Sequence, residues 1–270
     1  MGVACYGRDV GERTSYSPGT FSWVDLSATD QDAAKTFYTQ LFGWQCNDNP
    51  IGEGMIYSIM SVDGKDVAAI SSQPQQQRDA GVPPTWNSYI SVRSADEVAE
   101  RAAQLGAHVH AEPFDVLDVG RMAVVQDPQG AFVLLWEPRA RIGADLVNVH
   151  GALVWNELAS PDVEASSRFY SELFGWTIEP IPGSEIPYLT IKTADGHSNG
   201  GMRAQMPDEP VPYWLTYFGV GALGQTLAQL EQLGGRKLVG PQSIGEAGEL
   251  AVVEDPQGAV FALYSGRFDD

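Results

Sequence analysis

Residues Ala34–Trp44 read AKTFYTQLFGW, and Ser166–Trp176 read SSRFYSELFGW, 132 positions later. A second motif, DPQGA, occurs at Asp127–Ala131 and returns at Asp255–Ala259. The motifs keep their order and almost their spacing, which predicts one duplicated domain rather than a solenoid of short repeats. At 270 residues the chain is long enough for two such domains, each with its own core.

Each half has the same order of predicted elements. Phe21–Leu26 alternates as a strand, and Asp30–Phe42 reads as a helix that Gly43 ends. A hairpin with the turn Asp63-Gly64 follows. The order then returns over residues 86–136 and twice in the second half, so we predict an α+β protein of four βαβββ modules in two pairs. Residues predicted to be purely structural are the caps and turn formers Asp30, Asp162, Asp127 and Asp255, and the tryptophans Trp44 and Trp176.

The motifs and linkers suggest the following domain boundaries. Residues 1–19 read as a disordered leader, 20–138 as the first domain, 139–149 as a linker and 150–266 as the second domain.

Composition and charge restrict the classes of function. Lys and Arg number 16 against 35 Asp and Glu, a formal charge of −19, which argues against nucleic acid and anionic membranes as partners. Such a field would attract a small cation, although it also serves solubility alone. No apolar run approaches the ~20 residues of a membrane span, and the start of the chain lacks a signal-peptide core. With only two cysteines, we expect a cytoplasmic protein without disulfides.

The FYxxLFGW and DPQG motifs, each present twice, resemble those of the vicinal oxygen chelate superfamily of glyoxalases, bleomycin resistance proteins and extradiol dioxygenases. The resemblance covers residues 19–266. The tandem form is similar to an actinobacterial "hydroxylase-like" subgroup and to members of aromatic polyketide (anthracycline-type) antibiotic pathways. It implies two glyoxalase-like domains, each with a curved mixed sheet that forms a cup for a ligand. Modules one and two could share a cup, or modules could exchange between halves.

The same resemblance implies where metal ligands would stand in each cup. Those positions hold Trp23, Asn87 and Leu134 in the first half and Trp155, Leu215 and Ala262 in the second. These side chains lack the donor set that divalent metals need, so we predict no metal. His108 and His110 are predicted to be surface or structural residues. No GxSxG, HExxH or GxGxxG motif is present, and no cofactor is predicted.

Strand alternation indicates which side chains line the cups. We predict ligand contacts from Trp23, Asp25, Asn87, Tyr89, Trp136, Trp155, Glu157, Leu215, Tyr217 and Tyr264. Aromatic walls with few polar groups suit a large planar molecule. In the alternative interpretation the tryptophans fill a closed core, and Asp25 and Glu157 form salt bridges with an arginine of another module.

Three candidate functions are compared with this interpretation. The first is metal-independent binding of a bulky aromatic, cationic or neutral, natural product, for drug sequestration, self-resistance or an accessory biosynthetic role. A biosynthetic oxygenase is then a candidate partner, and the chain would be a monomer or a homodimer. The alternative is a cofactor-independent isomerase or oxygenase (hydroxylase) with Asp25 or Glu157 as catalytic base. A metal-dependent glyoxalase or dioxygenase with displaced ligands is disfavoured by the ligand count.

Overall fold

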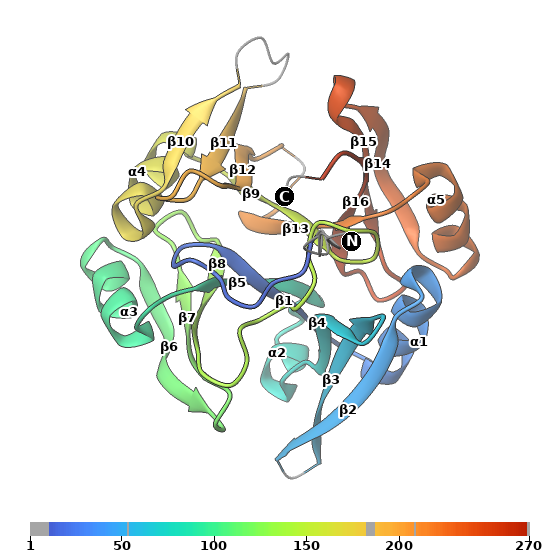
Figure 1. Cartoon of the computed structure of the whole chain (residues 1–270), viewed down its shortest axis with the longest axis horizontal. Coiled ribbons are helices and arrows are strands. Elements are labelled where there is room, and N and C mark those ends of the chain that lie inside the picture. The colour runs from blue at the N-terminus through green and yellow to red at the C-terminus, as the bar shows by residue number, and fades with distance from the viewer. Residues whose placement is uncertain (1–10, 53, 182–186, 208, 269–270) are drawn as a thin grey trace, which may run out of the picture.

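The chain forms two domains, each built on one eight-stranded curled mixed sheet (Figure 1). The computed structural model describes residues 11–52, 54–181, 187–207 and 209–268. The strand order of the first sheet is β2-β3-β4-β1-β5-β8-β7-β6, and the second sheet repeats it as β10-β11-β12-β9-β13-β16-β15-β14. The predicted α+β class and tandem duplication are therefore confirmed.

Elements of the first domain alternate as the repeat predicts. They are β1 (Phe21–Ala28), α1 (Gln31–Phe42), β2 (Gln45–Gly52), β3 (Met55–Val62), β4 (Lys65–Ser72), α2 (Gln75–Asp79), β5 (Thr85–Ser91), α3 (Ala95–Gln104), β6 (His108–Val116), β7 (Gly120–Gln126) and β8 (Phe132–Pro138). The second domain contains β9 (Leu153–Ser160), α4 (Val163–Phe174), β10 (Thr177–Pro180), β11 (Tyr188–Lys192), β12 (Ser198–Ala204), β13 (Tyr213–Gly219), α5 (Leu223–Gln232), β14 (Arg236–Ser243), a 3₁₀ turn (Gly245–Ala247), β15 (Gly248–Glu254) and β16 (Val260–Gly266).

Consecutive modules pair within one sheet, which settles the question that the sequence left open. The first strands of modules one and two, β1 and β5, run antiparallel at the centre of the first sheet. In the second sheet β9 and β13 do the same. Each cup is therefore formed by a single half of the chain.

The FYxxLFGW helices begin and end as predicted, in both copies. The Asp30 carboxylate accepts a hydrogen bond from the Ala33 amide at 3.0 Å and caps α1. Gly43 ends the helix with φ of 73°, a conformation that favours glycine. Asp162 and Gly175 have the same roles in α4.

The two repeated motifs meet across the domain interface. The hydroxyl of Tyr38 on α1 donates to the carboxylate of Asp255 in the DPQG turn of the other domain at 3.0 Å. Tyr170 on α4 donates to Asp127 at 2.8 Å in the reciprocal contact. Asp127 and Asp255 also accept amide hydrogen bonds within their own turns. They are thus turn formers, as predicted, and interdomain acceptors as well.

The backs of the two sheets pack against each other around an approximate twofold axis. Ser88 and Thr216 are equivalent residues, 128 positions apart, and their hydroxyls lie 3.5 Å from each other in the buried interface. Trp44 closes one edge by donating to the Gly151 carbonyl at 2.7 Å, and Trp176 donates to the Gly19 carbonyl at 2.7 Å. The predicted structural role of both tryptophans is confirmed. Because the backs are covered, the cups face away from the interface.

Some local predictions need correction. Residues 11–19 are not a disordered leader, because Arg13 and Tyr16 bond to the backbone of Asp145 and Ala144 at 2.8 Å; residues 1–10 lie outside the described residues. Strand β2 was missed because its side chains are mostly exposed and do not alternate. The connection between β4 and β5 contains the short helix α2, for which no element was predicted from the sequence. Among the described residues, no helix is both long and apolar enough to cross a membrane.

Candidate functional site

Asp25 is the polar centre of the first cup. Its Oδ2 accepts hydrogen bonds from the hydroxyls of Tyr89 at 2.6 Å and Tyr57 at 2.9 Å, and its Oδ1 accepts from the Asn87 amide at 2.8 Å. The Trp23 indole donates to the Tyr57 hydroxyl at 2.9 Å. The site therefore forms a chain of donors that ends on one carboxylate, which is 5% exposed.

The second cup repeats this arrangement around Glu157. Tyr217 donates to its Oε2 at 2.9 Å, and the Trp155 indole donates to the Tyr188 hydroxyl at 2.9 Å. Burial and the Glu157 charge raise the pKa of Tyr188, as burial and the Asp25 charge raise the pKa of Tyr57. The acid, two tyrosines and a tryptophan are thus common to both cups.

The cups differ in how the acid is balanced. The Arg203 Nε lies 2.7 Å from Glu157 Oε1, and its Nη2 lies 2.6 Å from Glu209. In the part of the chain that the structure describes, no Lys, Arg or His forms an ion pair with Asp25. The salt-bridge alternative therefore holds for Glu157 alone. Its arginine comes from β12 of the same module, not from another module as predicted.

Burial shifts the protonation equilibria of both cups. Burial raises the pKa of Asp25, against the opposing hydrogen bonds from Tyr89, Asn87 and Tyr57. The pKa of Tyr89 and of Tyr57 is also raised, by burial and by the nearby Asp25 charge. Burial alone would raise the pKa of Glu209, but hydrogen bonds, first of all from Arg203, hold it below its usual value.

All five predicted residues of the first half share one face of the sheet. Strand register places Trp23 beside Tyr89, Asp25 beside Asn87, and Tyr89 beside Leu134, with Trp136 two residues further along. Trp23, Tyr89, Leu134 and Trp136 are each less than 10% exposed, so they fill much of the cup floor. Tyr57 and Asn87 are half-buried and separate the carboxylate from solvent.

An apolar wall stands beside this polar centre. Met122 and Val124 of β7 pair with Trp136 and Leu134, so they line the same face and are half-buried. Phe132, on the outer part of the wall, is 45% exposed. The first cup thus combines an apolar wall with one carboxylate, a composition typical of small-molecule sites.

The predicted residues of the second half also gather on one face of their sheet. Leu215 is 1% exposed and Tyr217 4%, whereas Trp155 and Tyr264 are half-buried. The Tyr264 hydroxyl donates to the Ala247 carbonyl at 2.6 Å and so is engaged with backbone at the end of its strand.

Sequence reasoning missed four residues of these networks: Tyr57, Tyr188, Arg203 and Glu209. The recurrence of Tyr57 as Tyr188, 131 positions later and on equivalent strands, is a signal that could have identified the tyrosines. The position equivalent to Arg203 in the first half is Ser71, since Ser71 pairs with Tyr57 as Arg203 pairs with Tyr188. The repeat therefore gave no signal for the arginine.

The family fold raises the question of a metal, and the donor set does not fit one. In the first cup, the positions inferred for ligands hold an indole, an amide and an isobutyl group, and the Asn87 amide nitrogen already donates to Asp25. No group of three His, Cys, Asp or Glu residues suitable for a metal occurs among the described residues. The rings of His108 and His110 are 4.3 Å apart on an exposed edge strand, without a third such ligand.

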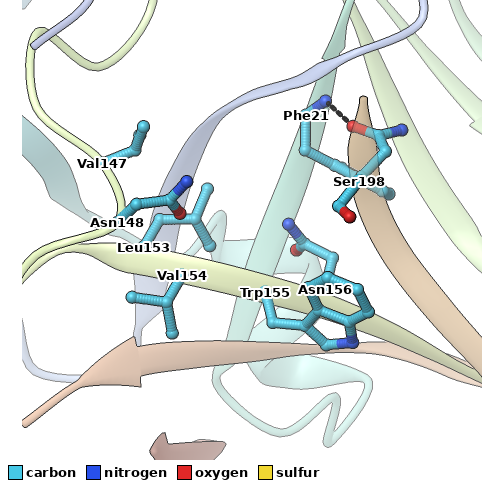
Figure 2. A pocket seen from close by; sticks show the side chains of 9 residues that line it. Phe21, Val147, Asn148, Leu153, Val154, Trp155, Asn156 and Ser198 are labelled. Carbon is cyan, nitrogen blue, oxygen red and sulfur yellow. Dashed lines mark hydrogen bonds between the residues drawn. The ribbon is translucent and has the colours of Figure 1, made fainter. Parts of the chain in front are cut away.

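Two hollows lie outside the cups. One is small, with a volume of about 70 Å³. It lies between β9 and the linker, next to Trp155 and to the hydrogen bond from the Phe21 amide to Asn199 (Figure 2). It is much smaller than the ~300–1,000 Å³ of typical ligand sites. The other, of about 450 Å³, lies between α1 and the Asp255 turn, where the Asp255 carboxylate is already bonded to Tyr38.

Two repeated eight-stranded curled sheets define the chain as a tandem βαβββ protein. Comparison with known families shows which superfamily it belongs to. The model of the Glyoxalase/Bleomycin resistance protein/Dioxygenase superfamily matches residues 20–135, and a model described as a glyoxalase-like domain matches residues 155–264. The chain belongs to this superfamily and contains two tandem domains of its type.

Two relatives match almost end to end. The chain is 41% identical over 256 residues to "Putative glyoxylase CFP32" of Mycobacterium tuberculosis. The alignment covers 93% of this chain and 97% of that protein. It is 30% identical over 269 residues to "Anthracycline biosynthesis protein DnrV" of Streptomyces peucetius, with 94% and 96% covered.

Solved structures show the same fold at low identity. The 2,3-dioxygenase LapB from Pseudomonas sp. KL28 aligns with a TM-score of 0.63 at 12% identity, covering 93% of this chain and 94% of LapB. The Mn(II)-bound glyoxalase from Novosphingobium aromaticivorans aligns with a TM-score of 0.62 at 16% identity, covering 94% and 85%. These likenesses describe the fold alone.

Proposed function

We propose that this protein binds an aromatic polyketide-type small molecule in a cup of its sheet, as a sequestering or accessory protein of an antibiotic pathway. The observation that carries the proposal is the buried carboxylate of Asp25, which lies beside an apolar wall and has no cationic partner among the described residues. A buried carboxylate is costly unless it is compensated, and such unbalanced groups gather at functional sites. The relative named for anthracycline biosynthesis supports the ligand class.

The cup can provide both kinds of contact that such a ligand needs. A planar ring system would pack against Trp136, Met122 and Phe132, because aromatic and apolar surfaces suit stacking. A polar substituent would reach the carboxylate by replacing the hydrogen bond that Asn87 now donates to Asp25. Since the floor is filled by Trp23 and Tyr89, binding requires side chains at the mouth to change rotamer, which is common on complex formation.

Binding is tested by titrating the whole protein with a panel of anthracyclines and simpler polycyclic phenols. Quenching of tryptophan fluorescence reports binding, calorimetry gives the stoichiometry, and mass spectrometry of the recovered ligand shows whether it was changed. Saturable binding with the ligand recovered unchanged in both mass and chromatographic retention supports a sequestering protein. The absence of binding up to ~100 μM would refute the proposal for these ligand classes.

The second candidate is a cofactor-independent proton-transfer enzyme with Asp25 as general base. It is favoured by the raised pKa of Asp25, since burial makes its carboxylate a stronger base than one in water. The Tyr89 hydroxyl, 2.6 Å from the carboxylate, could help hold a phenolic substrate. A product of unchanged mass but altered chromatographic retention, lost in Asp25→Asn, would establish an isomerase; its persistence in that variant would exclude Asp25 as the base.

A further inference from the structure

The two sheets have the same strand order, but the cups differ beside the acid, and one of these differences places a cation in the second cup alone. Asp25 pairs with Ala69 of β4, and Glu157 pairs with Gly201 of β12. Two residues further along, Ser71 therefore stands where Arg203 stands. The Ser71 hydroxyl donates to the Leu26 carbonyl at 3.5 Å.

Arg203 balances the charge of the acid in the second cup through ion pairs with Glu157 and Glu209. Its side chain is 13% exposed and bridges Glu157 and Glu209, which receive three of its hydrogen bonds at 2.6–2.8 Å. The Met206 amide and the Tyr213 hydroxyl also donate to Glu209, at 2.6 and 2.7 Å. A guanidinium held between two carboxylates has satisfied both of them and has little capacity left for a ligand.

Among the described residues, the hydrogen-bond donors to Asp25 are neutral. Tyr57, Tyr89 and Asn87 supply three hydrogen bonds to Asp25 but no positive charge. Attraction between opposite charges is strong at a site shielded from water, so a cation that reached this carboxylate would gain more than a neutral group.

We propose that the two cups have different roles: the first binds a ligand that carries a protonated amine, and the second is a structural copy closed by its own Arg203. The ligand ammonium would approach Asp25 from the side that Arg203 occupies at Glu157. This inference rests on the proposed function, because it assigns the working cup and the charge of the ligand.

A matched pair of probes tests the inference. Daunorubicin carries one ammonium group, and N-acetyldaunorubicin is the same ring system without that charge. Calorimetry should give one site per chain and an affinity for daunorubicin higher by ~10–100-fold, the range of a charge-assisted hydrogen bond. Asp25→Asn should reduce this ratio to about one, which excludes the bulk of the acetyl group as its cause. Glu157→Gln should leave the ratio unchanged.

A second variant tests the missing cation directly. Ser71→Arg introduces the guanidinium of the second cup into the first and should also bring the ratio to about one, whereas Ser71→Met, of comparable bulk, should keep it. Equal affinity for both probes, two sites per chain, loss of the ratio in Glu157→Gln or its persistence in Ser71→Arg would each overturn the inference while leaving aromatic binding intact. Binding of neither probe would refute the proposed function for anthracyclines, and this inference with it.

Discussion

Replacing Tyr38 with phenylalanine should lower the free energy of unfolding by about 2.5–6 kcal/mol. The fully buried hydroxyl donates to Asp255 at 3.0 Å and accepts from the Trp86 indole at 3.0 Å. A hydrogen bond to a charged group contributes ~1.5–3 kcal/mol, and an unpaired buried donor costs ~1–3 kcal/mol. The substitution removes the hydrogen bond to Asp255 and leaves the Trp86 N–H as an unpaired buried donor. The two costs therefore add.

Urea denaturation followed by circular dichroism measures this change. Because the domain is duplicated, the equivalent substitution in the second half tests the same contact independently. Tyr170→Phe removes the equivalent contacts, 2.8 Å to Asp127 and 3.1 Å from Trp214, and should cost a similar amount. Tyr16→Phe is the matched control, since it removes one hydrogen bond to a backbone carbonyl and should cost only ~0.5–1.5 kcal/mol.

A double-mutant cycle separates the two contributions. Trp86→Phe in the Tyr38→Phe background removes the orphaned donor, so the double variant should be less destabilised than the sum of the single variants. If Tyr38→Phe and Tyr170→Phe each cost under ~1 kcal/mol, the hydroxyls do not stabilise the domain interface and the reasoning fails.

Four further predictions test the cups. Arg203→Met should cost about 3–5 kcal/mol in urea denaturation, because it leaves two carboxylates without their cation. Burial raises the pKa of Asp25, so its contribution to stability is greatest below the unfolded value of ~3.9 and is lost as pH rises through the folded pKa; the stability of Asp25→Asn relative to wild type should therefore increase from pH 4 to pH 8. Gly120→Ala places a Cβ 2.3 Å from the Trp136 ring and should cost about 1–3 kcal/mol by thermal denaturation, whereas Gly224→Ala, with no atom within 4 Å, should be neutral or stabilising. Elemental analysis of protein purified without chelator should find no stoichiometric metal, and a bound metal would overturn our interpretation of the donor set.

Much of the fold could be predicted because local signals agree with the global pattern. Helix caps such as Asp30, the terminating Gly43 and the Asp63-Gly64 turn act within a few residues, so they are legible in the sequence. Strand β2 was missed because it lies at a sheet edge with mostly exposed side chains. The pairing of modules could not be predicted, since it depends on contacts between distant segments.

The candidate site was predicted less completely, for a related reason. Alternation along single strands correctly placed Trp23, Asp25 and Tyr89 on one face. The partners that decide the behaviour of each acid come from other strands, and alternation carries no information about them. Arg203 is separated from Glu157 by 46 residues in sequence yet bonds to it at 2.7 Å.

The duplication itself shows which parts of the molecule are constrained in different ways. Several residues that join the domains are identical in both halves: Tyr38 and Tyr170, Trp44 and Trp176, Trp86 and Trp214, Asp127 and Asp255. Each half must supply one side of the same reciprocal contact, so a change in either copy disturbs both domains. Residues of the cups differ between halves: Ser71 and Arg203, Asn87 and Leu215, Leu134 and Ala262. The cups face away from the interface and can change independently. One cup could therefore acquire an internal arginine while the other kept an uncompensated carboxylate, and the first cup is where we expect a ligand to act.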